Sequence, residues 1–170
     1  MSPPTRRRCR RHRVGAYSPE DPKPLRSYAA LTAAFNGGVV AFEAARRRRG
    51  WALPERIGPG DLALLAAGTY KLSRLISKDR VTSFVRAPFT RYTGEAGPAE
   101  VSEEPRGQGM RRAIGELLVC PYCVEQWVAA GFLGAYIRDP RGARTMASLF
   151  TVFAAADWLS QGWMALQEHT

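Results

Sequence analysis

The chain has 170 residues and a formal net charge of +10 at neutral pH, from 25 basic and 15 acidic side chains. This length allows one domain with a core of its own, and its 3 cysteines are too few for the disulfide scaffold of a small secreted domain. The charge would suit nucleic-acid binding, but no recognised binding motif accompanies it. Only Lys23, Lys71 and Lys78 are lysine, which indicates a general bias towards arginine, and we expect no nucleic-acid partner.

The first 26 residues are rich in arginine and proline and contain almost nothing apolar to bury. We predict a disordered basic tail at 1–26 and a helical membrane domain at 27–168. The arginines between Arg6 and Arg13 are either solvated or held against anionic lipid headgroups. The second alternative gains weight if the neighbouring helices enter a bilayer.

Residues 28–45 form the first apolar run, and its length approaches the thickness of a bilayer's hydrocarbon core. Asn36 and Glu43 are seven residues apart and therefore share one face of a helix. Four arginines, Arg46 to Arg49, end the run at the expected level of the headgroups. An amphipathic helix in water would show much the same pattern.

A second helix is predicted at 61–77, where Asp61 caps its start. Lys71, Arg74 and Lys78 form a basic stripe along its second half. Residues 79–89 alternate aromatic and basic side chains, which is typical of a segment lying at a membrane interface. Residues 93–108, rich in Gly, Pro and Glu, are expected to form a flexible loop.

Two further apolar runs follow at 114–137 and 146–166, and the second is long enough to span a bilayer. The four runs predict an all-α fold, a small membrane helical bundle of about four helices with an interfacial segment. The mean hydropathy of −0.26 suits a water-soluble protein. However, the tails and loops supply most of that polarity, and three of the runs lack the charged face of a surface helix. Membrane insertion is therefore favoured over a soluble bundle.

The sequence Cys120-Pro-Tyr-Cys123 opens the third run. Pro121 favours the first helical position, so Cys120 is predicted to be the cap, with both sulfurs near the positive end of the helix. Such a field stabilises a thiolate and suits thiol–disulfide chemistry, although structural packing or an occasional disulfide is the simpler interpretation. A zinc site with Cys9 and His12 is disfavoured, because the arginine-rich tail repels a dication. We expect no metal and no cofactor.

A set of motifs in a fixed order resembles the bacterial family known as domain of unknown function 1360. The motifs are Asp61-Leu, Gly68-Thr-Tyr-Lys-Leu-Ser-Arg-Leu-Ile, Lys78-Asp-Arg, Val85-Arg-Ala-Pro-Phe, Gly115-Glu-Leu-Leu-Val-Cys-Pro-Tyr-Cys123 and Trp127. The resemblance covers residues 28–166. It implies a small integral membrane protein, some members being linked to sporulation, with no established activity.

The residues that match carry no assigned role in that family, but their chemistry suggests a polar network that fixes helix packing. These candidates are Asp61, Arg74, Asp79, Arg86, Glu116, Cys120, Cys123 and Trp127. We expect the first four, which flank one helix with opposite charges, to pair among themselves. The last four share a face if their helix continues back through the cysteines.

Taken together, these features predict a multi-pass protein of the cell membrane with a structural or interaction role and the lipid bilayer as its partner. The alternative is a membrane thiol–disulfide oxidoreductase with Cys120 as the nucleophile and Cys123 as the resolving thiol. Between these two alternatives, the sequence favours the non-enzymatic role.

Overall fold

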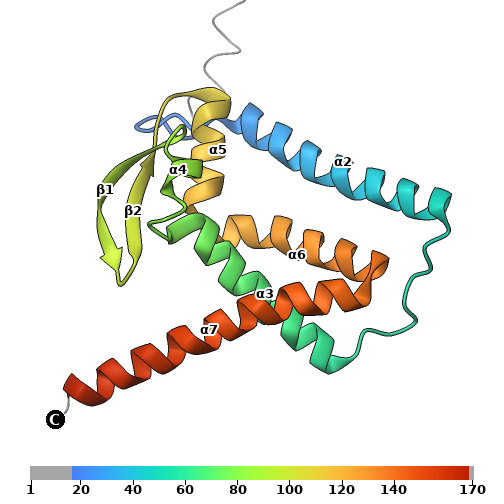
Figure 1. The fold of residues 1–170 in the computed structure, drawn as a ribbon. Coiled ribbons are helices and arrows are strands. Elements are labelled where there is room, and N and C mark those ends of the chain that lie inside the picture. The colour runs from blue at the N-terminus through green and yellow to red at the C-terminus, as the bar shows by residue number, and fades with distance from the viewer. Residues whose placement is uncertain (1–16, 169–170) are drawn as a thin grey trace, which may run out of the picture.

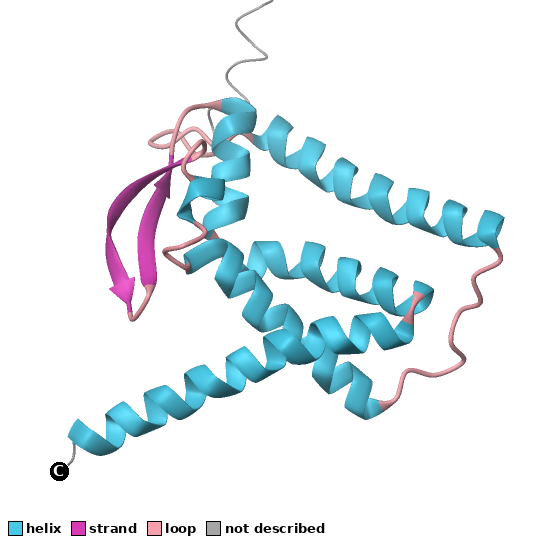
Figure 2. Ribbon diagram, viewed as in Figure 1, coloured by secondary structure: helices cyan, strands magenta, loops and turns pink. Residues whose placement is uncertain are grey.

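The computed structural model describes residues 17–168 and leaves out the side chain of Glu168. It is mostly helical, as predicted, with one small two-stranded sheet (Figures 1 and 2). The elements in chain order are α2 (Leu25–Arg49), α3 (Pro59–Lys78), α4 (Ser83–Arg86), β1 (Thr90–Gly97), β2 (Glu100–Pro105), α5 (Gly109–Val119), α6 (Pro121–Arg138) and α7 (Pro140–Glu168). The arginines of the tail before residue 17 lie outside the described residues.

Four long helices alternate in direction (Figure 1). Helices α2 and α6 run away from the end that carries the hairpin, and α3 runs back to it. Helix α7 runs in the same general direction as α3, crosses it and ends apart from the hairpin. The sheet, α4 and α5 gather at the first end, while the α2–α3 loop and the α6–α7 junction form the other. The chain is therefore an up-and-down arrangement of four helices with a small cap at one end.

The core is formed by α3, α6 and α7. Its central residues are Leu65, Phe132, Tyr136, Ala143 and Ala147. Gly68 permits the close approach of α3 to α7, since a Cβ atom there would lie 3.1 Å from the Ala147 carbonyl oxygen. Helix α2, in contrast, contributes no buried residue.

The segment expected to be a flexible loop is instead an antiparallel hairpin, so that prediction was wrong. Strands β1 and β2 pair from Thr90 opposite Pro105 to Gly97 opposite Glu100. Val101 is only 3% exposed, and α5 packs against β2. The strands are polar and Gly-rich and gain their stability from this packing, which a local pattern does not reveal.

The third apolar run is two helices with a sharp bend between them. Helices α5 and α6 meet at 82°. Cys120 at the junction has φ −104° and ψ 103°, because the ring of Pro121 pushes the residue before it out of the helical region. Glu116 therefore lies on a different helix from Cys123 and Trp127, and the face expected from one continuous helix does not form.

Within residues 17–168, no single helix combines the length and the apolar composition needed to cross a membrane. The bent pair α5–α6 reaches that length and composition only when the two helices are taken together. The runs at 28–45 and 146–166 thus fall short, as single helices, of the spans expected from the sequence.

Candidate functional site

The cysteine pair lies at the start of α6, half-buried, at the end of the molecule that carries the hairpin. Cys120 is the N-cap and Pro121 the first helical residue, as predicted. The backbone N–H of Cys123 donates to Cys120 Sγ at 3.3 Å, and the Cys123 thiol donates to the same sulfur at 2.6 Å. Both thiols are free. The two sulfurs therefore need only a small movement to form a disulfide.

Burial raises the pKa of the Cys123 thiol to about 11, and its hydrogen bond to Cys120 adds to this effect. Cys123 is therefore a protonated thiol at neutral pH, positioned as a donor to its neighbour. Among residues 17–168, no group of three or more His, Cys, Asp or Glu side chains is placed to hold a metal ion. Cys9 and His12 lie outside the described residues.

Glu116 ties the beginning of α2 to α5. Its carboxylate accepts hydrogen bonds from the Tyr28 hydroxyl and from Arg112 Nε, the latter at 3.0 Å. Arg112 also reaches Asp21 at 2.7 Å and holds the pKa of that carboxyl at about 2. The described end of the basic tail is thus anchored to α5.

Asp61 and Arg74 on α3 lie in separate ion pairs. Asp61 accepts from the Tyr136 hydroxyl at 2.5 Å and from Arg144 Nη2 at 2.7 Å, and Arg144 lowers the pKa of this carboxyl to about 2. Arg74 Nη2 donates to Glu100 Oε2 at 2.7 Å. One pair joins α3 to α7, and the other joins α3 to the hairpin.

Arg86 is completely buried and binds Glu103 at 2.5 Å. Its guanidinium also donates to the carbonyl oxygens of Ile76 at 2.6 Å and Asp79 at 2.9 Å. The side chain of Asp79 instead accepts from the N–H of Val81 at 2.9 Å.

The carboxylates that bind Arg74 and Arg86 are therefore Glu100 and Glu103, both from β2. The expected carboxylate–guanidinium pairs among Asp61, Arg74, Asp79 and Arg86 do not form. The sequence does not predict these partners, because the segment 93–108 that contains both glutamates has the composition of a flexible loop.

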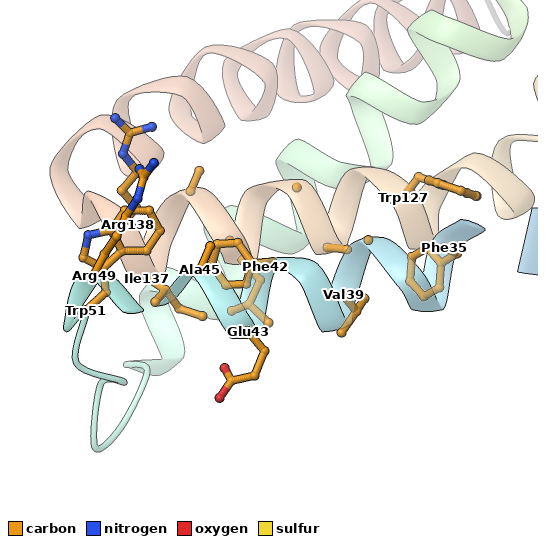
Figure 3. Close-up of a pocket in the computed structure, with 16 residues that line it drawn as sticks. Phe35, Val39, Phe42, Glu43, Ala45, Arg49, Trp51, Trp127, Ile137 and Arg138 are labelled. Carbon is orange, nitrogen blue, oxygen red and sulfur yellow. The ribbon is translucent and has the colours of Figure 1, made fainter. Parts of the chain in front are cut away.

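A cavity of about 760 Å³ lies between α2 and α6 (Figure 3). Most of its lining is apolar: Phe35, Gly38, Val39, Phe42, Ala45, Trp51, Trp127, Ala130, Gly131, Leu133, Gly134, Ala135 and Ile137, with Glu43, Arg49 and Arg138 as its charged residues. We call this cavity the α2–α6 groove. At one end, Trp127 and Phe35 make an edge contact with centroids 5.1 Å apart.

At the other end of the groove, two guanidinium groups lie close to the indole of Trp51. The Cζ atoms of Arg49 and Arg138 lie 5.3 Å and 5.8 Å from its ring centroid. The backbone of Trp51 is held by Arg46, whose Nη1 donates to the Trp51 carbonyl at 2.8 Å. The local sequence around Trp51 gives no indication of a role for it.

The chain matches the family model described as "Protein of unknown function (DUF1360)" over residues 64–163. The match includes the cysteine pair and Trp127, but Asp61 and the whole of α2 precede it. Searches of curated proteins and of solved structures found no match. Since the family model covers more than half of the chain, this protein belongs to the DUF1360 family.

Proposed function

We propose that the protein is an integral membrane protein with a structural or interaction role, whose long helices present an apolar surface to lipid between two charged ends. The observation that supports this proposal is the exposure of the apolar helix α2. None of its 25 residues is buried, and it has no charged side chain from Ser27 to Phe42. Val39 and Val40 on this helix are 46% and 68% exposed. A surface of this kind is costly in water and favourable in lipid.

Helix α7 presents a second exposed apolar surface. Its exposed side chains include Leu149, Val152, Phe153, Trp158, Leu159, Trp163, Met164 and Leu166. Large apolar patches on a protein surface mark contact with a membrane or with another protein. The two tryptophans near the end of α7 suit the interfacial level of a bilayer.

Charged residues are excluded from the middle of the four long helices. The uncharged stretches are residues 27–42, 62–70, 126–137 and 145–156. Two charges next to these stretches neutralise each other, because Lys71 on α3 forms an ion pair with Asp157 on α7. Helices α3 and α7 thus each carry an ionisable group that is paired in the assembled bundle, as ionisable residues are in membrane bundles.

The test is extraction of membranes with sodium carbonate after expression of the full chain, with a peripheral protein of the same membranes as the control. We expect the protein to sediment with the membranes while the peripheral protein is released. Release of both proteins into the supernatant would contradict membrane integration.

A second candidate, a thiol–disulfide oxidoreductase, is favoured by the 2.6 Å distance between the two sulfurs. The N–H of Cys123 donates to Cys120 Sγ at the N-terminal end of α6, which is where nucleophilic cysteines of this chemistry lie. A thiolate on Cys120 would attack a disulfide in a partner protein and displace one partner thiolate. Cys123, after losing its proton, would attack Cys120 Sγ and release the second partner thiolate. The protein is then oxidised to the disulfide and the partner reduced to the dithiol.

This chemistry predicts that a Cys123→Ser variant accumulates a mixed disulfide through Cys120, visible on a non-reducing gel and absent with reductant. A Cys120→Ser variant is the matched control and should trap nothing. If both variants behave alike, the pair is structural.

A further inference from the structure

We propose that the α2–α6 groove binds one anionic phospholipid, with an acyl chain along the apolar lining and the phosphate between Arg49 and Arg138. This inference rests on the proposed membrane location. It concerns the folded domain and is independent of the basic tail before residue 17.

The groove is open and apolar over most of its length. Its volume of about 760 Å³ lies within the range of small-molecule sites in proteins. Cβ atoms added at Gly38 and Gly131 would meet nothing within 4 Å, so both glycines face open space. Val39 and Leu133 line the groove and are 46% and 42% exposed. An acyl chain would cover this surface.

The polar end of the groove carries positive charge without a counterion from the chain. Within residues 17–168, neither Arg49 nor Arg138 has a carboxylate partner. The one acidic lining residue, Glu43, binds Arg46 and Arg47, each at 2.6 Å, and its side chain points away from α6 in Figure 3. Two guanidinium groups beside one ring are a suitable donor set for a phosphate.

The apolar part of the groove and its cationic end lie in the same order as the acyl chain and the headgroup of a lipid. Arg49 and Trp51 follow the uncharged stretch 27–42, so the cationic end lies at the level where headgroups would be. Charge complementarity favours an anionic occupant over a second copy of this chain, which would bring its own net charge of +10.

The experiment uses the full chain in neutral detergent with Trp158→Phe and Trp163→Phe, so that the remaining tryptophans, Trp51 and Trp127, both line the groove. The probes are phosphatidylglycerol and phosphatidylcholine with brominated acyl chains, which quench tryptophan fluorescence on contact. We expect half-maximal quenching at about tenfold lower phosphatidylglycerol than phosphatidylcholine.

Two pairs of matched variants distinguish binding in the groove from the effects of net charge or of an added side chain elsewhere on the protein. Arg49→Gln with Arg138→Gln should abolish the headgroup preference, whereas Arg48→Gln with Arg141→Gln removes the same charge from the same end, outside the groove, and should retain it. Gly38→Leu should weaken quenching by both lipids, whereas Gly37→Leu, one residue away and also facing open space, should not.

Equal quenching by the two lipids, or the same response within either pair of variants, would overturn the lipid site. A protein that resists carbonate but shows no headgroup preference contradicts this inference alone. Release of the protein by carbonate contradicts the membrane proposal. Quenching by the two lipids is measured separately in detergent micelles, and it tests the lipid site.

Discussion

Arg86 shows how a single residue holds the capped end of the molecule together. Its guanidinium is completely buried, and Glu103 beside it is 6% exposed. Five hydrogen bonds connect this guanidinium to Ile76, Asp79, Thr82, Ser83 and Glu103. The hairpin is thereby fixed to the end of α3 and to α4. Removing one member of such a pair leaves an uncompensated buried charge.

We predict that Arg86→Met lowers the free energy of unfolding by about 3–5 kcal/mol. The matched control is Arg91→Met, which removes an exposed ion pair with Glu104 at 3.4 Å and should cost less than about 1 kcal/mol. Denaturant unfolding of the purified protein in detergent, followed by circular dichroism, measures both. Similar losses in the two variants would contradict a stabilising role for the buried pair.

For single residues, the sequence predicts roles that depend on near neighbours, but it does not predict ion-pair partners that lie far along the chain. The cap at Cys120 follows from Pro121 and its neighbours, and the structure confirms it. The partners of Arg74 and Arg86 lie 26 and 17 residues further along the chain, on a hairpin whose strands have no apolar alternation. Nothing near either arginine specifies which carboxylate it will meet.

Among the secondary-structure elements, the close packing of the hairpin against α5 depends on Gly115. A Cβ atom there would lie 2.6 Å from the Phe89 carbonyl oxygen and 3.3 Å from Pro105 Cα. Both neighbours are backbone atoms that cannot move without shifting the hairpin. The long helices, in contrast, were predicted from apolar runs at 28–45 and 61–77 and observed at Leu25–Arg49 and Pro59–Lys78.

Gly115→Ala is expected to destabilise the protein by about 1–3 kcal/mol, because the added methyl group overpacks this contact. Gly162→Ala on α7 is the control, since its Cβ would meet nothing within 4 Å and alanine favours a helix by about 1 kcal/mol. The temperature midpoint of unfolding should fall in the first variant and stay level or rise in the second. If Gly115→Ala has the same unfolding midpoint as the wild type, the close contact at Gly115 does not determine how the hairpin packs on α5.

At the scale of the whole molecule, the helices form a small core on one side and leave α2 with its apolar residues outside it. The four apolar runs predict the long helices, but not the division of the third run into α5 and α6, nor which helix lies outside the core. That arrangement depends on Gly68 and Ala147, which allow α3 and α7 to come close, and on the bend at Cys120. The apolar exterior of α2 is the basis of the membrane proposal.

The most direct test of that proposal compares two positions of nearly equal exposure, Val40 at 68% on α2 and Tyr17 at 70% before it. Each is changed to cysteine in a chain whose Cys9, Cys120 and Cys123 are replaced by serine, and broken membranes are treated with a charged maleimide. We expect rapid labelling of Tyr17→Cys and no labelling of Val40→Cys until detergent is added, because the charged reagent is excluded from the hydrocarbon core. Equal labelling of the two positions in intact bilayers would contradict the membrane proposal.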